Sequence, residues 1–462
     1  MLNDKRLSIT RRKFQSNKLT NLTKLSRSTK RSKKISKTHI TFHNGILTIG
    51  GTIIEIAYED SHIFFDFGSE YNPAIPASNL QELLDKKMVP YINNIFDPRI
   101  ELIGYESVNK SGFKNEAVFL SHVHLDHSKI VNYLNPSIPL YTLEGTKSLL
   151  ETLNINDDFL FPLIPAQKNK SKNTVRTIIG TKSDETIEIG KIKVTLISVD
   201  HDAYGSCGLF IQTPDLSIAY TGDLRLHGYR KADTMKFCQI CKNCDVLLIE
   251  GVSVSFQDTN YTPPAKEISN EQDLINKISE LVNENPEKQI TFNYYISNIE
   301  RIMKIIDAVP RKVVLSAYYS YILKDATGYQ SYYYNLDGRD YGLAKDKCVE
   351  YDTLLSDHKE YMWQLTSTDD IDKLLPNGIY IHSNAVPLGH FDPRFAPFMQ
   401  QFESKNIKFE WLCVSGHAYP KDLIRIIDSI KPKLLVPIHS YRPERLYNKY
   451  GRRLLPKKGQ IL

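Results

Sequence analysis

The stretch FLSHVHLDHSKI, residues 119–130, holds three histidines and one aspartate within six consecutive positions, 122–127. It continues the apolar run AVFL at 117–120, which predicts a buried strand that ends where the polar cluster begins. On an extended strand end, His122 and His124 point the same way because side chains alternate with a period of two. Asp126 and His127 follow in the turn and face a second, adjacent point. The spacing therefore predicts two neighbouring metal sites, each served by one pair.

Two such pairs leave both metals short of ligands, so further ligands are expected at the ends of other strands. Three candidates meet this expectation. His201 ends KVTLISVDH, Asp223 ends SIAYTGD, and His439 ends LLVPIHS. A carboxylate at Asp223 would bridge both metals. Each candidate alone could equally be an ordinary polar residue, but their joint occurrence at strand ends argues against chance.

These motifs resemble those of a known family. The chain is similar to the metallo-β-lactamase fold through its first four motifs, Asp66, His122-x-His124-x-Asp126-His127, His201 and Asp223. It also resembles the β-CASP branch of nucleic-acid-processing nucleases, through Glu250 ending DVLLIE, SGHA at 415–418, and His439 in PIHS. Within that branch the similarity is strongest to the ribonuclease J family, through SNIERIMKI (297–305) and SGHAYPKDLIRIIDSIKPKLLVPIHS (415–440).

The resemblance implies an α/β fold class: an αββα metallo-β-lactamase sandwich with an inserted β-CASP α/β cap domain and a disordered basic N-terminal tail. The implied domains are the tail (1–38), the first part of the metallo-β-lactamase domain (39–255), the β-CASP domain (256–400) and a completing metallo-β-lactamase segment (401–462). After residue 255 helices and strands alternate, which predicts a parallel sheet with crossover helices. The pattern weakens between 324 and 370, where we expect irregular structure.

The resemblance also implies a ligand set for two zinc ions, with Mn²⁺ as an alternative. One ion would be held by His122, His124 and His201, the other by Asp126, His127 and His439, with Asp223 bridging them. Asp66 would orient ligands from outside the coordination sphere and tune their basicity.

The implied reaction is attack of a metal-bound hydroxide on phosphorus, with Asp126, His417 and Glu250 as catalytic residues. His417 would contact the scissile phosphate and protonate the leaving oxygen, with Glu250 hydrogen-bonded to it. Substrate contacts are expected from the Ser415-Gly416 pair in SGHA. They are also expected from Ser297-Asn298, where backbone N–H groups at a helix start could receive a phosphate. The alternative for that pair is an ordinary N-cap.

The function implied is a dinuclear zinc phosphodiesterase that cleaves single-stranded RNA, as an endonuclease, a 5′-exonuclease or both. A β-CASP DNA nuclease is the nearest alternative, because the metals contact the phosphate and not the sugar. A catalytically silent RNA-binding subunit and a hydrolase of small esters are alternatives from other classes. A homodimer is compatible with this interpretation.

Composition separates a basic tail from an acidic body. Residues 1–38 carry thirteen Lys/Arg and one acid, a net charge of +12, whereas the rest carries 46 Lys/Arg against 52 Asp/Glu, a net of −6. Such a tail is typical of a polyanion-binding arm, and equally of a solvated extension.

Neither the cysteines nor the apolar runs point to secretion or to a membrane. No run reaches the ~18 apolar residues of a membrane span, so no membrane association is expected. Cys238, Cys241 and Cys244 have a spacing that suits a metal, or a buried helix side. Without a secretion signal, the six cysteines favour reduced thiols in the cytoplasm.

Overall fold

The computed structural model describes residues 37–70, 77–105, 113–164, 174–256, 268–390 and 392–462. The expectation of a disordered tail at 1–38 falls almost entirely outside these ranges. Within them, three sheets organise the chain.

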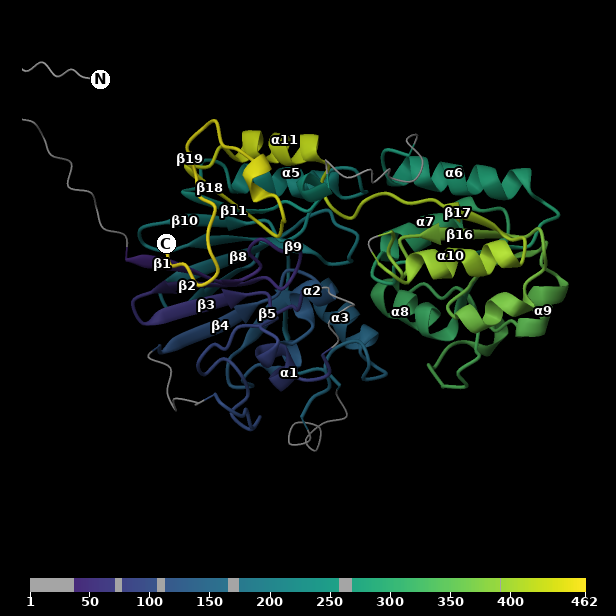
Figure 1. Cartoon of the computed structure of the whole chain (residues 1–462), viewed down its shortest axis with the longest axis horizontal. Helices are drawn as coiled ribbons and strands as arrows, with labels where there is room; N and C mark the ends of the chain where they lie inside the picture. Colours follow the sequence, from purple (N-terminus) through teal and green to yellow (C-terminus); the bar gives the residue numbers. More distant parts are fainter. Residues whose placement is uncertain (1–36, 71–76, 106–112, 165–173, 257–267, 391) are drawn as a thin grey trace, which may run out of the picture. The chain divides into compact units, whose positions relative to one another are not determined.

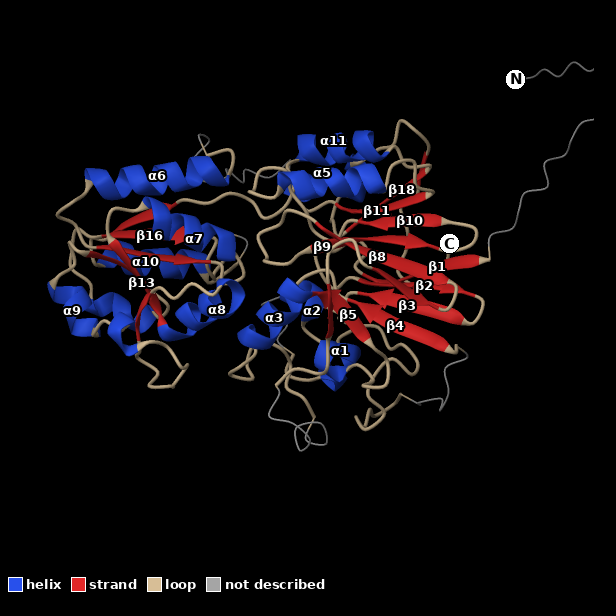
Figure 2. Ribbon diagram, turned by 180° about the vertical axis from the view of Figure 1, so that it is seen from behind, coloured by secondary structure: helices blue, strands red, loops and turns tan. Residues whose placement is uncertain are grey.

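Two sheets form a sandwich (Figure 1, Figure 2). The first has the order β1-β2-β3-β4-β5-β6 and the second the order β19-β18-β11-β10-β9-β8-β7. The strands of the first sheet are β1 (Thr38–Asn44), β2 (Ile53–Tyr58), β3 (Ser61–Phe65), β4 (Asn115–Phe119), β5 (Leu140–Leu143) and β6 (Ile179–Thr181). The strands of the second are β7 (Thr186–Ile189), β8 (Ile192–Ser198), β9 (Cys207–Gln212), β10 (Ser217–Tyr220), β11 (Val246–Glu250), β18 (Leu434–Ile438) and β19 (Arg452–Arg453).

Alternating apolar residues create the core between these sheets. Phe42 and Ile54 on the first sheet belong to the same buried cluster as Leu196 and Leu209 on the second. The outer face of the second sheet is covered by α5 (Lys231–Ile240) and α11 (Pro420–Ile430), which lie side by side in both views. The outer face of the first sheet packs against α1 (Leu80–Asp85) and α3 (Glu144–Leu153). The layers confirm the predicted αββα sandwich.

The third sheet is parallel throughout, in the order β14-β13-β15-β12-β16-β17. Its strands are β12 (Ile290–Tyr294), β13 (Lys312–Ser316), β14 (Tyr332–Tyr334), β15 (Tyr361–Gln364), β16 (Ile379–Ser383) and β17 (Lys408–Trp411). One face packs against α6 (Glu271–Glu284), α7 (Ile299–Ala308) and α8 (Ala317–Thr327), the other against α9 (Tyr351–Ser356) and α10 (Phe395–Ser404). The second sheet then receives β18 and β19, which follow the third sheet in the chain. The domain boundaries expected from the sequence stay a proposal. The third sheet extends past the expected boundary at residue 400, because its strand β17 spans Lys408–Trp411.

The expectation of irregular structure between 324 and 370 was wrong. β15 lies between β12 and β13 inside the third sheet, and its Met362, Trp363 and Gln364 are fully buried. The strand has only four residues and is flanked by polar segments, so its sequence carries no clear period. Tertiary burial on both faces, not local propensity, specifies this strand.

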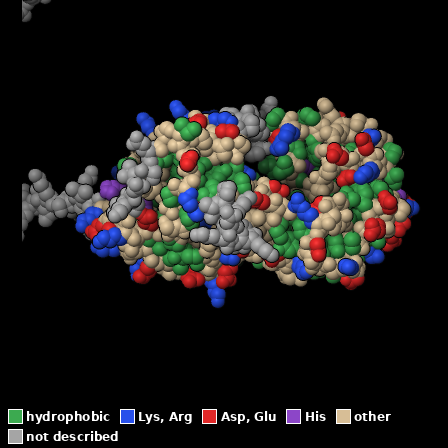
Figure 3. All heavy atoms as spheres, turned by 90° about the horizontal axis from the view of Figure 1, so that it is seen from below, with side chains coloured by type: hydrophobic (Ala, Val, Ile, Leu, Met, Phe, Trp, Pro, Cys, Tyr) green, Lys and Arg blue, Asp and Glu red, His purple; other side chains and the backbone are tan. Residues whose placement is uncertain are grey.

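The surface charges and the character of the helices bear on binding to polyanions and to membranes. On the face drawn in Figure 3, basic and acidic side chains are interspersed. Among the helices of the described residues, none combines the length and apolar character that a membrane crossing requires.

Candidate metal centre

The predicted metal ligands follow strands whose ends meet at one edge of the sandwich. His122 comes after β4, and Asp126 and His127 lie in the short helix α2 (Leu125–Ser128). His201 and Asp223 come shortly after β8 and β10, which run in the same direction because both are antiparallel to β9. His439 follows β18, which is parallel to β11 and hence to β10. The sheet topology therefore brings residues far apart in sequence to one place.

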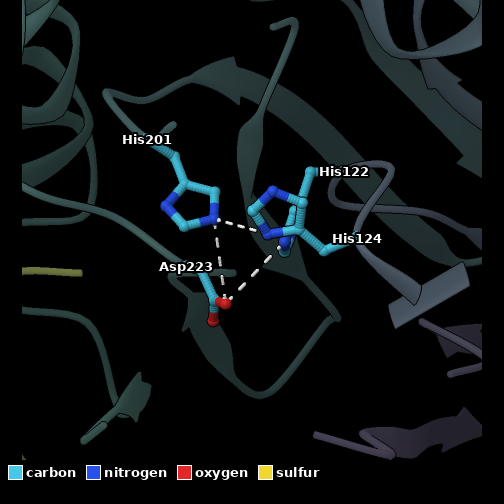
Figure 4. Close-up of side chains that lie close together, drawn as sticks. All are labelled: His122, His124, His201 and Asp223. Carbon is cyan, nitrogen blue, oxygen red and sulfur yellow. Dashed lines mark hydrogen bonds and ion pairs between the residues drawn. The ribbon is translucent and has the colours of Figure 1, made fainter. Parts of the chain in front are cut away.

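The first ligand group consists of His122, His124, His201 and Asp223, whose ligand atoms lie within 4.8 Å of one another (Figure 4). His201 Nε2 is 3.1 Å from His124 Nδ1 and 3.9 Å from Asp223 Oδ2. Ligands at zinc–nitrogen and zinc–oxygen distances around one tetrahedral ion would be about 3.4 Å apart. The group therefore has the size that one such ion requires.

The second ligand group consists of Asp126, His127, Asp223 and His439, with the same spread of 4.8 Å. Asp223 Oδ2 lies 3.2 Å from His127 Nε2 and 3.6 Å from His439 Nε2. The same oxygen lies 3.7 Å from His122 Nε2 of the first group. One carboxylate oxygen thus lies close to ligands of both groups, and the bridging of two metals by Asp223 stays a prediction.

Several buried polar atoms of the two groups lack hydrogen-bond partners, and this shows whether metal ions would fit between them. Asp223 Oδ1 and the Nε2 atoms of His122 and His439 are buried and find no hydrogen-bond partner among the described residues. Such atoms cost on the order of 1–3 kcal/mol each when nothing satisfies them. Divalent cations between these atoms would remove that cost, so the residues fit metal ions.

The outer hydrogen bonds of the rings fix which nitrogens face inward. His201 Nδ1 donates to the carbonyl of Gly416 at 2.7 Å, which leaves a lone pair on Nε2. His122 Nδ1 lies 2.9 Å from Ser121 Oγ, and that hydroxyl donates to Asp66 at 2.9 Å, so the ring is the donor to Ser121. The inner nitrogens of both rings therefore carry lone pairs, as metal ligands require.

His439 is held differently. The backbone N–H of Gly50 donates to His439 Nδ1 at 3.2 Å, which in a neutral ring places the proton on Nε2. Metal binding through Nε2 therefore requires the other neutral tautomer, with the proton on Nδ1, where the Thr52 hydroxyl lies 3.5 Å away. The residue also has a φ of 51°, a strained value for a non-glycine residue that is enriched at functional sites.

Burial and charge shape the protonation of the histidines. Burial lowers the pKa of His201 to about 3 and holds that of His122 well below its ordinary value. His417 behaves oppositely: burial opposes its charge, but Asp223 and Glu250 outweigh burial and raise its pKa to about 9. His201 and His122 are therefore neutral near pH 7, whereas His417 is protonated.

Asp66 lies outside both groups and holds them in place. Its Oδ2 accepts from His127 Nδ1 at 2.8 Å, and its Oδ1 accepts from the backbone N–H of Ser121 at 2.8 Å. The hydroxyl of Tyr220 also donates to it. Asp66 therefore contacts a ligand of the second group directly, and the orienting role expected of it stays a prediction.

The loop Val414–Ala418 places His417 beside both groups, with its ring next to those of His201 and His439. The Nδ1 atom of His417 is 3.7 Å from Asp223 Oδ2, and its side chain is 22% exposed. Its distance to Glu250 Oε1 is 3.6 Å, which is longer than the hydrogen bond that we expected. Glu250 instead accepts from two backbone N–H groups, those of Val252 at 2.9 Å and Ala418 at 3.3 Å. Glu250 thus contacts the His417 loop through the N–H of Ala418, which also donates to the carbonyl of Leu224 at 2.7 Å.

The expected substrate contacts are engaged within the protein. Ser297 and Asn298 are 1% and 2% exposed. Asn298 is the N-cap of α7, accepting from Arg301 N at 3.2 Å. Ser415 Oγ accepts from the backbone N–H of His417, and Gly416 orients His201 through its carbonyl. Phosphate binding by these four residues stays a prediction.

Sequence reasoning missed two features of the site. Asp202 Oδ1 is buried, 3.4 Å from His201 Nε2, and has no hydrogen-bond partner among the described residues. Its position directly after His201, in Asp200-His201-Asp202, was the available signal. The second feature is a buried ion cluster in which Glu271 pairs with Arg225 at 2.8 Å and Arg301 at 2.7 Å. No local pattern announces it, because its members are far apart in the chain.

The three clustered cysteines do not form a metal group. Within the described ranges, the metal-capable groups are the two given above. Cys238, Cys241 and Cys244 are buried in the apolar layer between α5, α11 and the second sheet. Burial raises the pKa of Cys238 to about 12 and of Cys244 to about 12, so these thiols act as small apolar residues.

Comparisons with known proteins agree with this geometry. The model of the beta-lactamase superfamily domain matches residues 96–268. The chain is 23% identical over 428 residues to ribonuclease J of Mycoplasma genitalium, covering 87% of this chain and 68% of that protein. It is 25% identical over 251 residues to a probable RNase MJ4 of Methanocaldococcus jannaschii, covering 53% of this chain and 50% of that protein.

A solved structure is more similar in sequence. The crystal structure of a protein of unknown function from Enterococcus faecalis V583 shares 44% identity, with a TM-score of 0.87. The alignment covers 92% of this chain and all of that one. The αββα sandwich, the divalent metal centre and these similarities lead to one conclusion. The chain belongs to the metallo-β-lactamase superfamily as a metal-dependent hydrolase, and it is similar to ribonuclease J.

Proposed function

We propose that this protein is a dinuclear zinc phosphodiesterase that cleaves single-stranded RNA. The observation that carries the proposal is the shared oxygen of Asp223. It belongs to both ligand groups, and the proton-bearing His417 lies 3.7 Å from it. A phosphodiester needs charge neutralisation at phosphorus and a proton at the leaving oxygen, and this arrangement offers both from one side.

The donor atoms favour zinc over harder cations. The first group offers three imidazole nitrogens and one carboxylate oxygen, a set that zinc prefers. The second group offers two nitrogens and two carboxylates, so it also suits Mn²⁺. Zinc ions held there would lower the pKa of a water molecule to about 7 and withdraw charge from a bound phosphate.

The protein's own residues have separate tasks in this proposal. Asp126 and Asp223 supply the negative charge that retains two cations close together. Asp66 fixes the ring of His127. His417 is placed to donate its proton to the leaving ribose oxygen, and Glu250 holds the loop that carries it. Removal of a general acid of this kind typically costs ~10²–10⁴-fold in rate.

RNA is the proposed substrate because the two named relatives are called ribonucleases. Since the chain spans 68% and 50% of those proteins, their activity comes to this chain only as a proposal. We further propose that residues 256–400 form a domain that binds the nucleic acid beside the metal centre. A reducing cytoplasm suits the chain, since its six cysteines are all free thiols.

The proposal is tested by cleavage of matched single-stranded RNA and DNA oligonucleotides, each with a 5′-monophosphate or a 5′-hydroxyl, in the presence of Zn²⁺ or Mn²⁺. Asp126→Ala serves as the inactive variant. Asp357→Ala, an exposed aspartate after α9, is the matched control. We expect RNA cleavage by the parent chain and the control and none by Asp126→Ala.

The other outcomes of this assay would identify one of the alternative functions or the mode of cleavage. Cleavage of DNA alone would identify a β-CASP DNA nuclease. If the metal-loaded protein cuts neither polymer, a hydrolase of small esters or a silent RNA-binding subunit takes its place. A preference for the 5′-monophosphate would indicate an exonucleolytic mode, and indifference to the 5′ end an endonucleolytic one.

A further inference from the structure

His124, a ligand of the first metal group, contacts a loop that follows strand β12 of the third sheet. The loop Tyr295–Asn298 joins β12 to α7, and its Ser297 Oγ lies 3.0 Å from His124 Nε2. The ring of Tyr295 stands edge-on to the His124 ring, with centroids 5.0 Å apart. The other two histidines of this group have different partners. His122 contacts the neighbouring Ser121, and His201 donates to the carbonyl of Gly416.

The single proton of the Ser297 hydroxyl fixes the direction of the hydrogen bond between Ser297 and His124. The hydroxyl of Ser297 donates to the backbone carbonyl of Asp202 at 3.1 Å, and a carbonyl can only accept. Ser297 has a single O–H, so it must accept from His124, whose Nε2 therefore carries the proton. The lone pair then lies on Nδ1, the nitrogen that is 3.1 Å from His201 Nε2 inside the ligand group. Two inward lone pairs at that distance repel each other unless a cation lies between them.

His124 depends on this contact more than its neighbours depend on theirs. Its side chain is 12% exposed, whereas those of His122 and His201 are fully buried. The next acceptor, Asp202 Oδ1, is 3.8 Å from His124 Nε2, which is too long for a hydrogen bond. Without Ser297 the ring could turn away from its metal-facing orientation.

Ser297 itself is rigidly held. It is 1% exposed, and its backbone carbonyl accepts from the N–H of Tyr204 at 3.0 Å. The adjacent Asn298 caps α7. The two bonds of Ser297 to residues 202 and 204 also tie its loop to the loop that presents His201. The hydroxyl is therefore a fixed acceptor, as a group that orients a metal ligand must be.

We propose that Ser297 is a positioning residue for the metal centre, through which the segment containing the third sheet sets the affinity of the first metal group. The inference rests on the metal groups of the proposed function but not on its substrate. Loss of an outer hydrogen-bond partner of a metal ligand typically weakens metal binding ~10–100-fold. The second group has no contact with Ser297 among the described hydrogen bonds and should keep its affinity.

The test measures zinc binding to the full chain, by competition with a chromophoric chelator of known affinity. Ser297→Ala removes the acceptor, and Ser297→Thr keeps a hydroxyl at the same atom. Ser331→Ala is the matched control, because Ser331 is also buried in the third-sheet segment but bonds to Ser320, away from the metal ligands. Circular dichroism and thermal unfolding of chelator-treated protein verify that each variant folds. Absorption of Co²⁺ in place of zinc reports on the ligand geometry directly.

We expect Ser297→Ala to bind one of its two zinc ions ~10–100-fold more weakly, with a changed Co²⁺ spectrum, while Ser297→Thr and Ser331→Ala resemble the parent chain. The inference is overturned if folded Ser297→Ala binds both ions with parental affinity, or if Ser331→Ala loses as much. If Ser297→Thr does not fold, the comparison of the two alanine variants decides. A parent chain that binds no zinc would instead remove the proposed function, and the two failures are thus distinguishable.

Discussion

Asp66 and His127 are both fully buried, and Asp66 Oδ2 accepts from His127 Nδ1 at 2.8 Å. The same carboxylate accepts from Ser121, whose hydroxyl in turn accepts from His122. One aspartate directly after β3 therefore contacts a ligand of the second group and, through Ser121, a ligand of the first. Its φ of 58° shows that the backbone leaves the strand sharply there to present the carboxylate.

Asp66→Asn should weaken zinc binding at both groups. The carboxylate accepts hydrogen bonds from four donors, and an amide would turn an NH₂ toward at least one of them. We expect ~10–100-fold weaker zinc binding and a loss of about 1–3 kcal/mol in stability for the unsatisfied donor. Zinc competition and urea unfolding measure the two effects. Parental zinc affinity in this variant would show that Asp66 does not orient the ligands.

His417→Ala should retain both zinc ions and lose turnover. His417 belongs to neither ligand group, yet it lies beside Asp223, where a leaving oxygen would need a proton. The expected drop in kcat is ~10²–10⁴-fold at unchanged zinc content. His39→Ala, an exposed histidine on β1, is the control. Should the variant cleave at the parental rate, His417 is not the general acid.

The buried Glu271 should contribute stability that disappears in acid. Burial favours its protonated form, but Arg301 and Arg225 outweigh burial and lower its pKa to about 2. A carboxyl group whose pKa is lowered on folding stabilises above its unfolded pKa of about 4.5, and the contribution is lost as the pH falls toward 2. The contribution at pH 7 is on the order of 3 kcal/mol.

Urea unfolding of the parent chain and Glu271→Gln at several pH values tests this. The difference in free energy of unfolding should be largest at about pH 5–7 and shrink below about pH 4.5. Other acid-sensitive groups are common to both proteins and cancel in the difference. A difference that does not change between pH 7 and pH 3 would contradict the assignment.

Removal of residues 1–36 should weaken RNA binding and reduce its salt dependence. This segment carries twelve Lys/Arg and one Asp, whereas the body is acidic overall. Each phosphate contact that is lost lowers the slope of log K against log salt by about 0.7 for a single strand. Filter binding or fluorescence anisotropy between roughly 50 and 300 mM salt measures the slope. An unchanged slope would show that the tail does not contact RNA.

The ligand positions could be predicted from the sequence because they follow a rule of sheets. The carboxyl ends of strands that run in the same direction lie at one edge of a sheet, so the strand assignments alone led us to expect His201, Asp223 and His439 near the His-x-His-x-Asp-His motif. The αββα layers followed from the family resemblance and are confirmed by the two facing sheets.

What could not be predicted depends on contacts between distant segments. The bond of Ser297 to His124 joins residues 173 positions apart, and the Glu271–Arg301 pair lies within a cluster drawn from several elements. The missing hydrogen bond between Glu250 and His417 is of the same kind, because backbone N–H groups compete for the carboxylate. β15 was missed because a four-residue strand has no readable period.

Seven residues form two candidate metal groups that share Asp223, so the number of zinc ions bound per chain is the decisive quantity. Native mass spectrometry of the parent chain, Asp126→Ala and Asp223→Ala, with Asp357→Ala as control, gives that number. We expect two zinc ions in the parent and the control, one in Asp126→Ala, and at most one in Asp223→Ala, because both groups lose the shared oxygen. Two zinc ions retained in folded Asp223→Ala would contradict this expectation.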